Sequence, residues 1–139
     1  MDLLARREYG IRELEQKLIQ KGCPREIAAG AVDGLKRDGL VSDERFVESL
    51  VQNRRERGYG PLRIEHELQE KGIARSVIDQ WLDPRDPAWL DVLREVHRRK
   101  YGAMAPESYQ ERARRARFLQ SRGFSAEQVM KVLKADEFD

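Results

Sequence analysis

A segment bounded by helix-breaking residues occurs twice in this chain, at a spacing of 50 residues. Its second copy, residues 58–73, opens with Gly-Tyr-Gly-Pro and closes at Gly72-Ile73. Between these breakers, Ile64 and Leu68 lie four residues apart and therefore share one face of a helix. The 50-residue shift superimposes breakers and apolar positions alike: Tyr9 on Tyr59, Gly10 on Gly60, Leu14 on Ile64, Leu18 on Leu68, Lys21 on Lys71, Gly22 on Gly72, Arg25 on Arg75 and Ile27 on Val77. So many coincidences without a gap indicate an internal repeat of short amphipathic helices.

The alternation of breakers and amphipathic segments continues to the end of the chain. Asp86 and Pro87 predict a helix start. Ser42 is a predicted N-cap, and Ser125 with Gln128 forms a capping-box pattern. The apolar seams predicted to face the core include Ile27, Ala28, Ala31, Val32 and Leu35, then Val77, Ile78, Trp81 and Leu82, and finally Tyr109, Ala113, Ala116 and Leu119.

These patterns predict an all-α chain of three tandem three-helix repeats, with limits at about residues 1–40, 41–84 and 85–139. The composition agrees, because 40% hydrophobic and 37% charged residues suit helices with thin apolar seams. No repeat has a seam rich enough to fold well alone, so neighbouring repeats are expected to stack into an elongated, curved array. The first helix, over Leu3 to Glu8, is expected to be truncated at its start.

The single cysteine excludes an intramolecular disulfide framework and is typical of a reducing compartment. Cys23 lies where Ile73 lies in the next repeat, which favours a small buried side chain over a reactive thiol. No stretch approaches the roughly 18 apolar residues of a membrane helix, and the N-terminus lacks a signal-peptide core. We therefore expect a cytoplasmic protein without a membrane partner.

Positive charge gathers at two predicted helix ends and in one long segment. The formal net charge is only +2, but residues 94–122 carry nine Lys/Arg against three Glu, which is typical of a surface that faces a polyanion. Two other interpretations stay open: cations favoured by the dipole at a helix C-terminus, and tyrosines that pack over a turn instead of stacking on bases. The candidate binding residues are Arg54, Arg55, Arg57, Tyr59, Arg63, Lys71, Arg98, Arg99, Lys100, Arg114, Arg115 and Arg117.

Catalytic and metal-binding patterns are missing from the sequence. The two histidines, His66 and His97, have no second ligand at helix spacing and no cysteine nearby, whereas a metal site needs three or four converging groups. No serine or cysteine has a recognisable base, and no glycine-rich phosphate loop follows a strand. We therefore expect neither an enzyme nor a cofactor.

The central motif, Gly58-Tyr59-Gly60-Pro61-x-Arg63-Ile64-x-x-Glu67-Leu68-x-x-Lys71-Gly72-Ile73, resembles that of the RecX family, bacterial regulators of the RecA recombinase. Four flanking stretches agree with that family, so the resemblance runs from Leu3 to about Leu133. They are Leu3-Leu4-Ala5-Arg6-Arg7-Glu8-Tyr9 with Glu13-Leu14-x-x-Lys17-Leu18, Asp43-x-Arg45-Phe46, Arg99-Lys100-Tyr101-Gly102 and Arg117-Phe118-Leu119-x-x-Arg122-Gly123-Phe124.

The resemblance implies tandem three-helix repeats and a role in recombination, DNA repair and the SOS response. It implies a monomer that binds the RecA–DNA filament and inhibits its recombinase, ATPase and coprotease activities, by blocking extension or promoting disassembly. It also implies weak binding to single- and double-stranded DNA. The alternative that the residues leave open is a free-standing helical DNA-binding regulator that acts without RecA.

Overall fold

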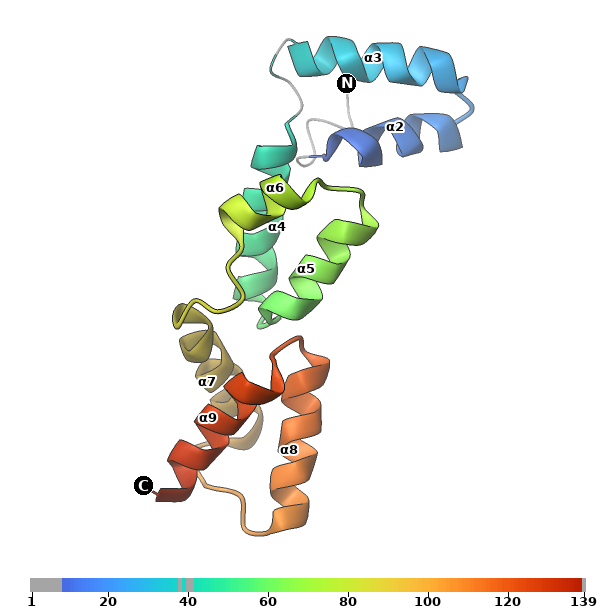
Figure 1. Cartoon of the computed structure of the whole chain (residues 1–139). Coiled ribbons are helices and arrows are strands. Elements are labelled where there is room, and N and C mark those ends of the chain that lie inside the picture. The colour runs from blue at the N-terminus through green and yellow to red at the C-terminus, as the bar shows by residue number, and fades with distance from the viewer. Residues whose placement is uncertain (1–8, 38, 40–41, 139) are drawn as a thin grey trace. The chain divides into compact units, whose positions relative to one another are not determined.

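The computed structural model describes residues 9–37, 39 and 42–138, and within these ranges every regular element is a helix. The predicted helix from Leu3 to Glu8 lies outside the described residues. In chain order the helices are α2 (Ile11–Gln20), α3 (Arg25–Arg37), α4 (Asp43–Glu56), α5 (Pro61–Glu70), α6 (Arg75–Trp81), α7 (Ala88–Tyr101), α8 (Tyr109–Ser121) and α9 (Ala126–Phe138). The all-α prediction is therefore confirmed (Figure 1).

The chain forms two compact units whose borders fall inside α4 and α5. One unit comprises Met1–Gln52 and Glu67–Trp81, and the other comprises Asn53–His66 and Leu82–Asp139. The predicted second repeat is thus divided between the two units, while the first and third each lie within one unit. The repeat limits themselves stay a prediction.

In the first unit α2 and α3 lie side by side (Figure 1). Tyr9, Leu14 and Val32 form their buried core. The start of α2 is tied to α4 because the Ile11 backbone N–H donates to the Asp43 carboxylate at 2.8 Å. The seam predicted from the repeat thus becomes the core of this helix pair.

In the second unit α7, α8 and α9 group around a larger core (Figure 1). Trp89, Leu93, Leu119, Phe124 and Val129 are each 2% exposed or less. Trp89 is the largest of them, and its indole N–H donates to the Asp83 carbonyl at 3.0 Å, so its one polar atom is satisfied. This core fixes the positions of the helix ends described below.

The start of α5 contacts the end of α8 closely, and two backbone hydrogen bonds join them. The Gly60 N–H donates to the Arg122 carbonyl at 2.7 Å, and the Leu62 N–H donates to the Gly123 carbonyl at 3.0 Å. A Cβ added to Gly60 would lie less than 3.0 Å from backbone atoms of Gly123 and Phe124. Gly123 also has φ +107°, a left-handed conformation that favours glycine. Only glycine fits on either side of this contact.

The predicted caps at Ser42 and at Ser125 with Gln128 are confirmed. Ser42 accepts a hydrogen bond from the Arg45 N–H at 3.3 Å, and Ser125 and Gln128 exchange both bonds of a capping box at 3.1 and 3.0 Å. The start predicted for α7 is displaced by one residue: Pro87 is the N-cap and the helix begins at Ala88, although the Asp86 carboxylate still accepts from the Ala88 N–H at 2.9 Å. These polar residues satisfy N–H groups that have no partner within their helices.

Several seam predictions are wrong. Ile27 is 62% exposed, Trp81 40% and Tyr109 83%, and Cys23 is only half-buried. In α8 the predicted Leu119 is buried, but Arg115 accompanies it in place of the predicted alanines. For α8 the reason lies in the register: superimposing Gly72 on Gly123 needs a shift of 51 residues, which places Arg115, not an apolar residue, on Ile64.

We expect Gly60→Ala to lower the free energy of unfolding by about 1–3 kcal/mol, because its methyl group would force the two backbones apart. Gly30→Ala in α3 is the matched control, since a Cβ there meets nothing within 4 Å. It should be neutral or stabilise by about 0.5–1 kcal/mol, because alanine is the better helix former. Urea unfolding followed by circular dichroism measures both, and equal effects would contradict the packing argument.

Candidate binding site in a basic groove

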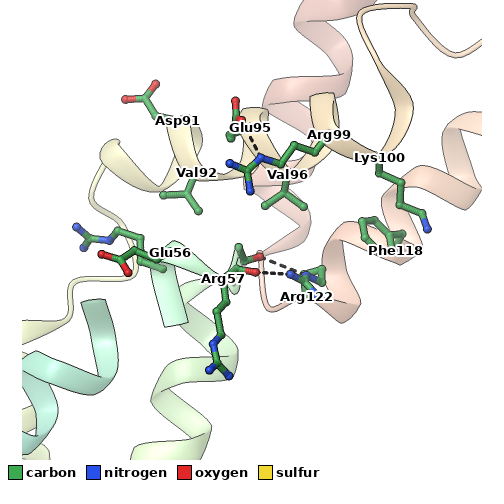
Figure 2. Close-up of a pocket in the computed structure, with 12 residues that line it drawn as sticks. Glu56, Arg57, Asp91, Val92, Glu95, Val96, Arg99, Lys100, Phe118 and Arg122 are labelled. Carbon is green, nitrogen blue, oxygen red and sulfur yellow. Dashed lines mark hydrogen bonds and ion pairs between the residues drawn. The ribbon is translucent and has the colours of Figure 1, made fainter. Parts of the chain in front are cut away.

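Three helix ends converge in the second unit and form a groove of about 650 Å³ (Figure 2). Residues from the end of α4, the exposed side of α7 and the end of α8 line it. Its cations are Arg55, Arg57, Arg99, Lys100 and Arg122, its carboxylates are Glu56, Asp91 and Glu95, and Gly58, Val92, Val96 and Phe118 complete the lining. The structure thus brings together two basic groups that lie more than 40 residues apart in the sequence.

Arg122 fixes one wall of the groove. Its guanidinium donates to the carbonyls of Arg57 and Gly58, just beyond the end of α4 (Figure 2). Helix C-termini leave carbonyls without intrahelical partners, and an arginine fork satisfies two of them at once. Because the Arg122 carbonyl also accepts from Gly60, this residue is held from both its backbone and its side chain.

Glu95 organises the opposite wall. Its carboxylate accepts a hydrogen bond from Arg99 at 2.9 Å (Figure 2). It accepts another from Arg98 at 2.7 Å. These two bonds lower the pKa of Glu95 below its usual value, and the same pairing raises the pKa of Arg98. Glu95 therefore stays ionised at neutral pH and offsets part of the positive charge that α7 presents.

Tyr59 lies between the helix ends and contacts two guanidinium groups. The Cζ atom of Arg63 lies 4.1 Å from the centre of its ring, and that of Arg122 lies 4.3 Å away. Two arginine guanidinium groups therefore lie against the ring of this tyrosine. Arg55 similarly lies 4.8 Å from the Trp89 ring, and Lys100 lies 4.5 Å from that of Phe118.

Other predicted candidates lie outside this groove. Lys71, in the first unit, forms an ion pair with Glu13. Arg54 donates to the Asn53 side chain at 2.6 Å. Arg114 and Arg117 are exposed on α8. Arg122, by contrast, lines the groove, although it was not among the predicted candidates. It directly precedes Gly123, as the candidate Lys71 directly precedes Gly72, and this correspondence in the sequence could have identified it.

Arg115 is a correction to the candidate set, because its side chain is buried at 3% exposure. It donates to the Met104 carbonyl at 2.8 Å and to the Glu111 carboxylate at 2.7 Å. It also lies 3.2 Å from His97 Nε2, which must be the acceptor because a guanidinium has only donors. The Tyr101 ring, 4.6 Å from the Arg115 Cζ atom, covers it. Arg115 therefore holds a loop in place and presents no charge to a partner.

The same network shifts two pKa values. The Arg115 hydrogen bond, followed by the Glu107 backbone N–H, lowers the pKa of Glu111 from its ordinary value of 4.5. Burial raises the pKa of Tyr101. Glu111 is therefore ionised, and Tyr101 neutral, at neutral pH.

No group of three or more His, Cys, Asp or Glu side chains in the described part of the chain is placed to hold a metal ion. None of the helices described here has the length and apolar character needed to cross a membrane.

Sequence models of the three RecX three-helix domains match residues 1–35, 42–82 and 88–133 in turn. The regulatory protein RecX of Ectopseudomonas mendocina is 46% identical over 134 residues, which cover 96% of this chain and 89% of the relative. The chain belongs to the RecX family. The regulatory protein RecX of Pseudomonas fluorescens Pf-5 is 43% identical over 139 residues, or 100% of this chain and 90% of the relative.

A crystal structure of a regulatory protein RecX shares the fold, with a TM-score of 0.78 at 22% identity over 96% of this chain and 67% of that one. The family resemblance of the central motif is thus confirmed, as is the fold of three-helix domains. RecX proteins are regulatory proteins and not enzymes, which agrees with the expectation for this chain.

We expect Arg115→Ala to lower the free energy of unfolding by about 1–3 kcal/mol, because it strands the Met104 carbonyl and the His97 acceptor. Arg114→Ala removes the neighbouring exposed arginine and should change stability by less than about 0.5 kcal/mol. Chemical denaturation compares the two variants. A similar loss in both would show that the buried network contributes nothing beyond helix propensity.

Acid should destabilise the third repeat through Glu111. Its folded pKa is depressed, so its contribution is present above the ordinary value of 4.5 and is lost as the pH falls below it. Melting temperatures measured from pH 7 down to pH 3 should therefore fall more steeply for the native chain than for Glu111→Gln. Glu107→Gln, an equal change of charge just before α8, should keep the native pH dependence.

Proposed function

We propose that this RecX chain binds the RecA–DNA filament and inhibits its recombinase, ATPase and coprotease activities, by blocking extension or promoting disassembly. In this proposal the basic groove is the contact with DNA in the filament. The observation that supports it is the convergence of Arg57, Arg99 and Arg122 on one groove from three different helix ends.

The groove suits a phosphate backbone better than a single small anion. Its five cations are spread along the walls instead of surrounding one point. Arginine and lysine at several positions neutralise successive phosphates and release counterions, so affinity becomes dependent on salt. The binding energy is then independent of base sequence, which suits a regulator that must act wherever a filament forms.

A double charge reversal tests the groove. Arg57→Glu with Arg99→Glu should leave the core intact, because both side chains are exposed. It should weaken suppression of RecA-driven ATP hydrolysis about tenfold or more, since two phosphate contacts become repulsive. Arg25→Glu with Lys36→Glu, exposed cations on α3, is the matched control and should suppress normally. A folded groove variant that suppresses ATP hydrolysis as well as the native chain would exclude this surface.

Titration of labelled single- and double-stranded DNA, with and without assembled RecA, tests the partner. We expect tighter binding to the filament than to bare DNA, because the filament adds protein contacts to the phosphate contacts. Equal affinity for both would favour a free-standing DNA-binding regulator instead.

Removing the carboxylate that opposes these cations should have the reverse effect. Glu95→Gln raises the net charge of the groove by one and releases Arg98 and Arg99 from their shared partner. DNA binding should tighten a few-fold, and the slope of log affinity against log salt should steepen by up to about 1. Asp79→Asn, which removes a carboxylate paired with Arg75 in the first unit, controls for net charge and should change neither quantity as much.

A further inference from the structure

A second groove, of about 550 Å³, lies between α8 and α9 and has a different character. Its floor is formed by small and apolar residues, and two large apolar side chains at its edge are exposed, Tyr109 at 83% and Met130 at 64%. The lining is Tyr109, Arg112, Ala113, Ala116, Arg117, Gln120, Ala126, Val129, Met130, Leu133 and Lys134. All its charged residues are cations.

The groove exists because only one face of α8 packs against the core of the second unit. Arg115 and Leu119 face the core, so the stripe that contains Ala113 and Ala116 is left at the surface. Alanine side chains end at Cβ, and so a helix backbone can approach α8 closely along this stripe. An uncovered apolar surface of this kind in a water-soluble fold marks an interaction site.

The preceding repeat carries acidic residues at two of these positions. With Gly72 superimposed on Gly123, Glu65 corresponds to Ala116 and Asp79 corresponds to Met130. Both acidic residues would place charge where the last repeat has apolar surface. The groove is therefore a property of the third repeat and not a consequence of repeat geometry.

The chemistry of the groove selects its occupant. An apolar floor with exposed methionine and tyrosine accepts the apolar side chains of an amphipathic helix at i, i+3 or i+4, and i+7. The exposed Arg117 and Lys134 then meet the polar face of that helix, which must be acidic to complement them. A DNA backbone fits poorly, because it offers nothing to the methyl groups of the floor.

We infer that the α8–α9 groove docks an acidic amphipathic helix from the protein component of the filament. The inference rests on the proposed function and adds to it a second contact, separate from the basic groove. The basic groove binds phosphate, and the α8–α9 groove distinguishes a protein-coated strand from bare DNA.

The test gives the third repeat the residues of the second. Ala116→Glu with Met130→Asp introduces the two carboxylates that the repeat scaffold already carries at Glu65 and Asp79. Gln69→Glu with Gln80→Asp adds the same charge to exposed positions of the second repeat and is the matched control. A neutral variant, Tyr109→Gln with Met130→Gln, removes only the apolar edge.

Binding is measured by fluorescence anisotropy on labelled single-stranded DNA, bare and coated with RecA held by a non-hydrolysable ATP analogue. We expect the carboxylate variant to lose about tenfold or more in affinity for the coated strand, and the neutral variant about fivefold. The affinity of both variants for bare DNA should stay close to that of the native chain. Thermal unfolding by circular dichroism confirms that each variant is folded.

Three results would overturn the inference, and they differ from one another. If both variants bind the coated strand like the native chain, the groove docks nothing although the proposed function stands. If only the carboxylate variant is weaker, general electrostatics explains the loss and no helix packs on the apolar floor. If the native chain itself binds the coated strand no more tightly than bare DNA, the proposed function fails and the inference fails with it.

Discussion

The close approach of two backbones at Gly60 and Gly123 is the constraint on which the second unit depends. Neither residue leaves room for a Cβ, and two N–H···O bonds join the segments. Because this contact is made by main-chain atoms, it does not depend on which side chains fill the neighbouring seam. A repeat can therefore exchange an isoleucine for Arg115 and keep its attachment. In the first unit Gly72 provides the corresponding space, which the Arg12 side chain occupies.

The same contact builds the basic groove. Arg122 precedes Gly123, so the bond from Gly60 to the Arg122 carbonyl also fixes where that guanidinium starts. The guanidinium then reaches the carbonyls that follow α4 and joins this helix end to the end of α8. The helix dipole favours a cation near the C-terminus of each helix. The contact brings such cations from several helices together in the basic groove. The close backbone contact and the position of the Arg122 charge therefore both depend on Gly123, the glycine that follows α8.

Local signals predicted this fold well because breakers and caps act over a few residues. Gly72 takes the left-handed conformation expected of a helix-ending glycine, and the Ser125–Gln128 capping box forms as its pattern indicates. The faces of α8 were mispredicted because the periodic rule counts apolar residues and takes arginine as exposed. Only the one-residue change in repeat length, from 50 to 51, indicates that Arg115 occupies a core position. The groove was half predictable: its cations are visible in the sequence, but their convergence depends on tertiary contacts.

Arg115 connects the two grooves. A buried arginine is costly unless its charge is paired, and an apolar residue at this position would serve stability as well or better. The arginine joins α7, α8 and the loop between them through hydrogen bonds. Its partners are His97 on α7, Glu111 on α8 and the Met104 carbonyl in the loop. This fixes α7, which carries Arg99 and Lys100, against α8, which carries the alanine stripe. The buried Arg115 therefore fixes the position of the basic groove relative to the α8–α9 groove.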